Sequence, residues 1–149
     1  MTPERDESTA KALAVVFGPI VAAADNVPTA IDVRGYRSAT LALAVGIGGI
    51  TFDTTNKVDF VLTHSFDDTT YTAVTDDDVI KDALAPAFIT NGIVRSLVAA
   101  HAAPTVQKLG YIGGRAYLKL LSDFSGTHGT GTPLAAIVVK EEAEFQGAN

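Results

Sequence analysis

Hydrophobic and polar residues alternate along much of this chain from residue 29 onward. Between Ser38 and Val45, apolar side chains occupy every second position, and the same period returns between Val58 and Ser65. A period of two places successive side chains on opposite faces of an extended strand. Helical periodicity never extends beyond about eight residues. The pattern therefore predicts a chain built from β-strands.

Clusters of glycine, proline and aspartate divide this pattern into about eight short strands. We expect the strands at residues 30–33, 38–45, 58–65, 70–74, 92–100, 105–112, 115–121 and 134–140. Short strands at this spacing are typical of an all-β sandwich or barrel and not of βαβ units. The simplest interpretation is an all-β fold, a single antiparallel β-sandwich of jelly-roll or immunoglobulin-like type formed by residues 28–140.

The two ends of the chain do not share this alternation. Residues 1–27 are predicted to form an extended N-terminal arm with one short strand, because Gly18-Pro19 interrupts the apolar run. Two alternatives stay open: a single helical turn near Lys11–Val16, or residues 10–24 as the first strand of the sandwich. Residues 141–149 are predicted to form a C-terminal tail.

One face of the predicted strands supplies a hydrophobic core. Each large aliphatic or phenylalanine side chain removed from water stabilises the fold by about 1.5–3 kcal/mol. Truncating Phe60 or Leu43 to alanine is therefore expected to cost about 2–5 kcal/mol. The expected core residues are Leu41, Leu43, Val58, Phe60, Leu62, Leu118, Leu120, Ile137 and Val139.

The composition supports one folded domain. The chain has 149 residues, the usual size of one domain, and 47% of them are apolar. That apolar content is too high, and the net charge too modest, for intrinsic disorder. The chain contains no cysteine, which excludes a disulfide scaffold, thiol catalysis and cysteine-ligated zinc.

The charge balance argues against two classes of partner. Seventeen acidic and eleven basic residues give a net charge of −6, and the bases lie singly along the chain. Such a chain repels a phosphate backbone, so we expect no binding to nucleic acid or to an anionic membrane. No apolar run approaches the ~20 residues of a membrane-spanning helix. Residues 1–7 lack the pattern of a signal peptide, so we expect no secretion.

No catalytic signature stands out. The glycine-rich segments 46–51 and 126–131 lack the spacing and the lysine of nucleotide-binding loops, and turns account for their glycines. The histidines form no metal-binding pair in the sequence, and no serine lies in a G-x-S-x-G turn. We therefore expect no enzymatic activity and no cofactor. The residues weighed for such sites are His64, His101, His128, Ser65, Ser96, Ser122 and Ser125.

Aspartates and tyrosines leave another binding hypothesis open. Asp67–Asp68 and Asp76–Asp78 bracket one short strand, and their oxygens suit calcium if the two turns converge. The spacing of an EF-hand loop is absent, and turn formation explains the aspartates equally well. The chain has no tryptophan, and Tyr111 and Tyr117 are expected to pack across the turn between them. A small carbohydrate- or calcium-binding module therefore stays as a second alternative function.

Four segments resemble a known family. They are residues 31–40 (IDVRGYRSAT), 63–71 (THSFDDTTY), 108–120 (KLGYIGGRAYLKL) and 131–140 (GTPLAAIVVK). Together they are similar to a family of small virion proteins of tailed bacteriophages, prophages and gene-transfer particles, commonly encoded beside the major capsid protein. The resemblance covers about residues 28–140. The chain departs from it at Ala116, where the family usually has a basic residue, and after Lys140.

The resemblance implies a non-enzymatic capsid decoration, or cement, protein. Such a protein would bind the outer surface of the major capsid protein lattice of its own phage and stabilise the shell, with self-association on the capsid as a further option. It would be made in the host bacterial cytoplasm and reside on the capsid surface of the virion. A tail-tube, adaptor or host-binding virion component is the alternative, with residues 82–91 as a loop that orders on assembly.

The apolar part of the predicted arm is the candidate contact with the capsid. This segment has little reason to fold alone, and ordering on a lattice would bury it. The predicted partner-binding residues are Leu13, Val15, Val16, Phe17, Ile20 and Val21.

Overall fold

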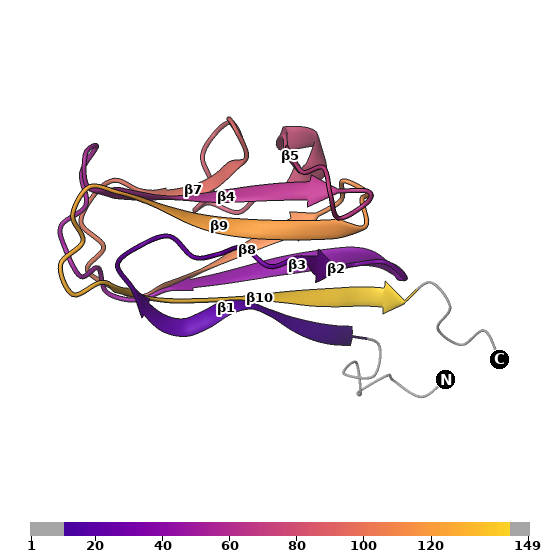
Figure 1. Ribbon diagram of the computed structural model, residues 1–149, viewed down its shortest axis with the longest axis horizontal. Helices are drawn as coiled ribbons and strands as arrows, with labels where there is room; N and C mark the ends of the chain where they lie inside the picture. The colour runs from indigo at the N-terminus through magenta and orange to yellow at the C-terminus, as the bar shows by residue number, and fades with distance from the viewer. Residues whose placement is uncertain (1–10, 144–149) are drawn as a thin grey trace.

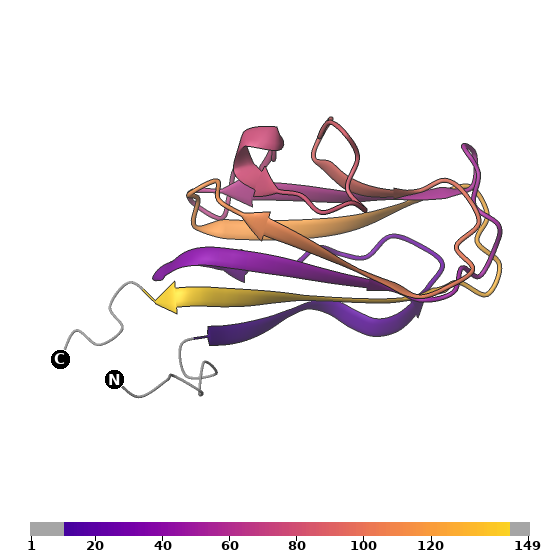
Figure 2. The same cartoon turned by 180° about the vertical axis from the view of Figure 1, so that it is seen from behind.

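The computed structural model describes residues 11–143, which form a β-sandwich of two antiparallel sheets (Figure 1 and Figure 2). A 3₁₀ turn, η2 (Asp76–Asp78), is the one helical element in this range. The predicted all-β antiparallel sandwich is confirmed. Each of the predicted strands overlaps an observed one.

One sheet, called here the β10 sheet, has five strands in the order β1, β10, β3, β8, β6. Their bounds are β1 (Lys11–Ala22), β10 (Thr132–Ala143), β3 (Tyr36–Val45), β8 (Thr105–Tyr111) and β6 (Val79–Ile80). The other, the β4 sheet, has the order β2, β9, β4, β5, and β7 also pairs with β4. Their bounds are β2 (Ile31–Asp32), β9 (Tyr117–Ser125), β4 (Lys57–Ser65), β5 (Thr72–Ala73) and β7 (Ile93–Leu97).

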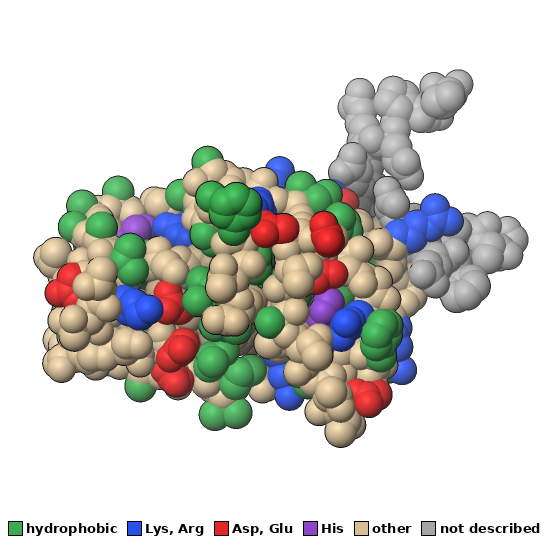
Figure 3. All heavy atoms as spheres, turned by 90° about the horizontal axis from the view of Figure 1, so that it is seen from above, with side chains coloured by type: hydrophobic (Ala, Val, Ile, Leu, Met, Phe, Trp, Pro, Cys, Tyr) green, Lys and Arg blue, Asp and Glu red, His purple; other side chains and the backbone are tan. Residues whose placement is uncertain are grey.

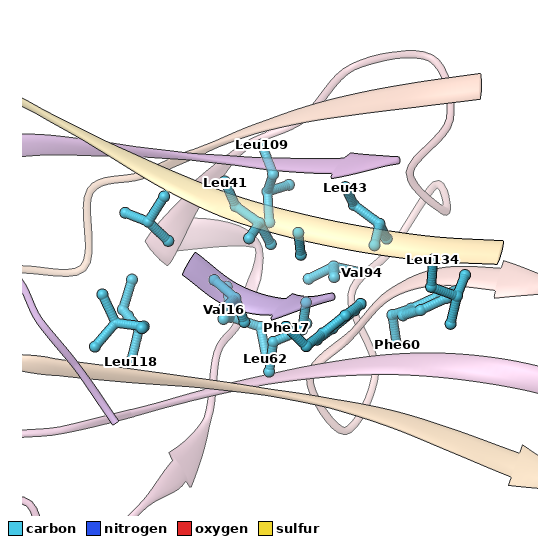
Figure 4. Close-up of a cluster of buried hydrophobic side chains, with 14 of the residues drawn as sticks. Val16, Phe17, Leu41, Leu43, Phe60, Leu62, Val94, Leu109, Leu118 and Leu134 are labelled. Carbon is cyan, nitrogen blue, oxygen red and sulfur yellow. The ribbon is translucent and has the colours of Figure 1, made fainter. Parts of the chain in front are cut away.

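The inward-facing rows of the two sheets meet in one hydrophobic core. Alternate residues of β3 from Ala39 to Val45, and of β4 from Val58 to His64, are buried as their period predicts. Figure 4 shows Leu41 and Leu109 of the β10 sheet across the core from Leu62 of the β4 sheet. The core thus holds the two sheets face to face and leaves each sheet one outer face.

Strand β10 presents its residues in the opposite phase to the one expected. Leu134, Ala136 and Val138 are buried, whereas Ile137 is 37% exposed. The prediction that Ile137 and Val139 belong to the core is therefore wrong, because side chains of odd and even number point to opposite faces of a strand. Residues 134–139 are apolar at every position, so that their pattern does not fix the face.

The predicted N-terminal arm is corrected over residues 11–22, which form strand β1 at the edge of the β10 sheet. The strand pairs with β10 from Lys11↔Glu141 to Ala22↔Thr132. The open alternative of a first strand of the sandwich is the one that the structure contains. Residues 1–10 of the predicted arm lie outside the described residues.

Two irregularities in β1 explain why its sequence did not clearly predict one long strand. The pairing with β10 shifts register between Val15 and Phe17 and again between Phe17 and Ile20. Such bulges bring neighbouring residues to the same side of a strand, and Val16 and Phe17 are both buried in the core (Figure 4). Gly18 has φ +71, and a Cβ there would overlap the carbonyl oxygen of Leu134. Only glycine fits both conditions.

The C-terminal end of the sandwich lies later than predicted. β10 continues to Ala143, where it pairs with Tyr36 of β3. Residues 141–143 of the predicted tail therefore belong to the sheet. The rest of that tail, residues 144–149, lies outside the described residues.

Candidate functional site

The outer face of the β10 sheet is hydrophobic across four strands. Leu13 and Val15 of β1 are 70% and 64% exposed, and Val21 and Val106 are exposed to a similar degree. The surface, called here the outer apolar face, is made of Leu13, Val15, Val21, Ala42, Ala44, Val106, Ala135, Ile137 and Val139.

Register places these side chains side by side. Val15 pairs with Ile137, and Ile137 pairs in turn with Ala42. One step along, Ala135 pairs with Ala44, and Ala44 pairs with Val106. Directly opposed residues of neighbouring strands have their Cβ atoms about 4.5–5.5 Å apart, so the apolar side chains form a continuous surface and not scattered single exposures.

A shallow groove deepens one end of this face. It has a volume of about 400 Å³ and is lined by Pro19, Ile20, Val21, Pro104, Val106 and Pro133, among other residues. Prolines have a fixed φ and small conformational freedom, so the groove is preformed. A preformed apolar groove is suited to receive a hydrophobic side chain of another protein.

The outer side of the β4 sheet has a different character. Lys57 forms an ion pair with Asp59 at 2.8 Å, and the hydroxyl of Ser96 donates a hydrogen bond of 2.6 Å to the same carboxylate. Figure 3, which views the molecule from the side of β4 and β7, shows acidic, basic, polar and hydrophobic side chains mixed together. The two sheets therefore differ in what they offer to a partner.

Four of the six predicted partner-binding residues lie on the exposed side of β1, namely Leu13, Val15, Ile20 and Val21. The other two, Val16 and Phe17, are part of the core, so a partner cannot reach them without unfolding β1. The sequence analysis missed the contribution of β10, β3 and β8. The available signal was the unbroken apolar run of residues 134–139, since strands covered on both faces have such runs.

The aspartates of the first turn are engaged within the turn itself. Asp67 accepts hydrogen bonds of 2.9 Å from the backbone N–H groups of Thr69 and Thr70 and from the hydroxyl of Ser65. These hydrogen bonds lower the pKa of Asp67, and the bond from the backbone of Thr70 has the largest effect. Asp68 accepts a hydrogen bond from the hydroxyl of Tyr71. Turn formation therefore accounts for both carboxylates.

The second aspartate cluster is engaged in the same way. Asp76 pairs with Lys81, which lowers the pKa of Asp76, and also accepts a bond from the backbone of Ile89. Asp78 accepts bonds from the backbone and hydroxyl of Thr75 at 2.8 and 3.1 Å. Over residues 11–143, no three histidine, aspartate or glutamate side chains form a possible metal site. The two aspartate turns therefore do not form the set of ligands that the calcium hypothesis requires.

The three histidines lie at separate places. The hydroxyl of Tyr111 lies 2.8 Å from Nδ1 of buried His64, and Asp78 lies 3.9 Å from its Nε2. Burial, reinforced by the charge of Arg115, lowers the pKa of His64. His101 contacts the carbonyl of Gly46, and His128 contacts the carbonyl of Ser125.

Three of the serines weighed for catalysis have other hydrogen-bond partners. The hydroxyls of Ser65, Ser96 and Ser122 donate to Asp67, Asp59 and Asn26. In the described part of the chain, no hydrogen bond joins a serine hydroxyl to a histidine ring.

The loop at residues 82–91 is tied to the sandwich in the isolated chain. Asp82 accepts hydrogen bonds of 2.9 Å from the backbone N–H groups of Leu84 and Lys108. Lys81 donates a bond of 2.7 Å to the carbonyl of Ala87. These hydrogen bonds attach residues 82–91 to the sandwich within the single chain.

The part of the chain that the structure covers contains no helix long and apolar enough to span a membrane. No protein-family model and no curated protein matches this chain. Among solved structures, the crystal structure of the SPBc2 prophage-derived protein YomS is similar to it. The match has 11% sequence identity and a TM-score of 0.49, and it covers 89% of this chain and 93% of YomS.

Proposed function

We propose that this protein is a non-enzymatic structural component of a phage particle, a capsid decoration or cement protein. It would dock through the outer apolar face onto the outer surface of the major capsid protein lattice and stabilise the shell. The observation that carries the proposal is the continuous hydrophobic surface across β1, β10, β3 and β8. The resemblance of residues 31–40, 63–71, 108–120 and 131–140 to small virion proteins supports the choice of partner.

A hydrophobic sheet face of this kind indicates a protein contact. Burying apolar surface stabilises a complex by about 25 cal/mol per Å², and the strands are held in one conformation by the sandwich. Docking therefore requires little ordering of the chain, which reduces the entropic cost of association. A specific interface buries about 1,200–2,000 Å² in total, and a capsid repeats that contact at every equivalent position.

The charges of the chain are consistent with docking through the outer apolar face. Lys108 lies beside Ala42 at the β8 side of the outer apolar face, where its charge can stay in water while the apolar rows are covered. The net charge of the whole chain is −6. With the outer apolar face turned toward the shell, this negative charge would keep decorated particles apart.

The direct test is co-sedimentation of the purified protein with empty shells of its own phage. The wild type is expected to pellet with shells, and Val15→Asp is expected to lose binding because the charge must be desolvated at the contact. Val27→Asp is the matched control, since Val27 is exposed and lies outside the outer apolar face. Equal binding of Val15→Asp and wild type, or failure of the wild type to bind shells, would contradict the proposal. Immunogold labelling of intact particles distinguishes capsid from tail.

A further inference from the structure

A second hollow lies at the end of the sandwich where the β2–β3 and β8–β9 turns meet. It has a volume of about 450 Å³, and its walls include Tyr36, Phe66 and Tyr111. Three of the five arginines of the chain line it: Arg34, Arg37 and Arg115. In a chain with a net charge of −6, this concentration of guanidinium groups is local and directed at one cavity. None of the residues lining it belongs to the outer apolar face.

Arg37 reaches this cavity because of its phase in β3. The inward row of β3 runs Val45, Leu43, Leu41, Ala39, and the next residue in that row is Arg37. Its side chain therefore extends the core-facing row past the end of the core, to the open mouth between the sheets. Among residues 11–141, whose side chains the structure describes, no carboxylate lies within ion-pair distance of Arg37, so that its guanidinium has no counter-ion among them.

Arg115 faces the cavity from the turn between β8 and β9. Its guanidinium lies 4.6 Å from the centre of the Phe66 ring, and its Nη1 donates a hydrogen bond of 2.7 Å to the hydroxyl of Thr72. These contacts hold the guanidinium in place without neutralising it. Arg34 differs, because it makes a bidentate pair with Asp32, its Nη2 lying 2.7 Å from Oδ2. The two arginines available for an anion are therefore Arg37 and Arg115.

The mouth of the cavity is open to a polypeptide. Gly35 and Gly114 both have positive φ, and a Cβ at either position would meet no atom within 4 Å. Phe66 is 69% exposed and offers an apolar surface beside the guanidinium of Arg115. An acidic side chain beside this wall of the cavity is Asp32, which is paired with Arg34.

We propose that this cavity binds an acidic side chain on a peptide segment of a partner protein. A carboxylate between Arg37 and Arg115 would accept charge-assisted hydrogen bonds from both guanidinium groups, the geometry that arginine recognises best. The carbon chain of the acidic residue and its neighbours would contact Phe66 and Tyr36. A polyanion such as nucleic acid is disfavoured, because the net negative charge of the whole chain repels it. The site is separate from the outer apolar face, so it does not depend on the proposed function.

The test uses nuclear magnetic resonance titration of the full-length protein with four probes at fixed ionic strength. They are the peptide acetyl-Gly-Glu-Leu-Glu-Gly-amide, the same peptide with glutamine for both glutamates, inorganic phosphate and free glutarate. The acidic peptide is expected to shift the amide signals of Gly35, Gly114 and Arg115 saturably. The neutral peptide is expected to leave them unchanged. Free glutarate, added separately, is expected to bind more weakly than the acidic peptide, because it lacks the neighbouring chain.

Two variants and one control decide the result. Arg37→Gln and Arg115→Gln are each expected to weaken binding of the acidic peptide about tenfold, which is the effect of losing one charge-assisted hydrogen bond. Lys119→Gln is the control, because Lys119 also lies over an aromatic ring, that of Tyr71, but outside the cavity. Arg37 has a solvent-exposed side chain, so Arg37→Gln tests the site even if Arg115→Gln perturbs the fold.

Four results would overturn the proposal: no saturable shift with the acidic peptide, equal binding of the neutral peptide, equal weakening by Lys119→Gln, or tighter binding of phosphate or glutarate than of the peptide. Each of these outcomes leaves the co-sedimentation test of the outer apolar face unaffected.

Discussion

Val15 of β1 lies directly opposite Ile137 of β10, and both side chains face away from the core. In a sandwich of two sheets, the outward position of a cross-strand pair is normally polar on at least one strand. Here two large aliphatic side chains are exposed to solvent at directly opposed positions. This pair lies on the β1 side of the outer apolar face and is the first position to change when the role of that face is tested.

Exposed and buried residues of β1 are expected to respond differently to truncation. Phe17→Ala should lower the free energy of unfolding by about 3–5 kcal/mol, because it leaves a cavity in the core. Leu13→Ala, at a position 70% exposed, should change it by less than about 0.5 kcal/mol. Urea denaturation of both variants measures the difference. Equal and small effects would mean that β1 is not packed on the sandwich, as in the arm first expected from the sequence.

The irregular pairing of β1 can be tested by comparing alanine substitutions at Gly18, which lies in β1, and at Gly35, which lies in an open turn. Gly35→Ala should cost about 1–2 kcal/mol, the usual penalty for a left-handed backbone, since its surroundings are open. Gly18→Ala should cost clearly more, because its Cβ would also overlap the Leu134 carbonyl oxygen. Thermal or urea unfolding of the two variants provides the comparison. An effect of Gly18→Ala no larger than that of Gly35→Ala would argue against the observed pairing of β1 and β10.

Buried His64 predicts a stability that falls in mild acid. Its folded pKa is lowered from 6.5, mainly by burial, so the folded protein excludes a proton that the unfolded chain takes up below that pH. The contribution is complete above pH 6.5 and declines as the pH falls toward the folded pKa, by at most about 1.4 kcal/mol per pH unit. His64→Gln should remove this component, measured as the difference between the unfolding free energies of the two proteins against pH. Parallel curves for wild type and variant would refute the assignment.

Calcium at millimolar concentration is expected to leave the Tm unchanged relative to magnesium. The oxygens of Asp67 and Asp78 already accept hydrogen bonds from their own turns, and Asp76 accepts one from the backbone of Ile89, so a cation would have to displace those bonds. Thermal melts with either salt measure the effect. A saturable rise in Tm with calcium alone, abolished by Asp67→Asn, would restore the calcium hypothesis.

The strands that could be predicted well from the sequence are those whose large apolar residues fall on one face. β3 alternates between buried residues from Ala39 to Val45 and more accessible ones between them, so both its existence and its inward face could be predicted. β10 could be predicted as a strand but not in its phase, because residues 134–139 are apolar on both faces. In β1 the bulges around Phe17 break the period that identifies a strand.

The candidate sites could likewise be predicted where they depend on a local sequence pattern and not where they depend on strand order. The exposed apolar residues of β1 were singled out from sequence, but Val106 and Ala44 join them only through strand order, which no local pattern encodes. Arg37 and Arg115 are far apart in the chain and meet only where two turns converge at one end of the sandwich. The aspartate turns were correctly given an alternative explanation, because their hydrogen bonds are local.

The interrupted pairing of β1 has a consequence for how copies of this protein can meet. An exposed edge strand offers free N–H and C=O groups to a second edge, and a long regular one promotes growth into fibres. In β1 the register shifts on either side of Phe17 divide that row of groups into two short stretches, and Pro19 contributes no N–H. The interrupted margin of β1 is therefore less suited to edge-to-edge growth than a long regular strand would be.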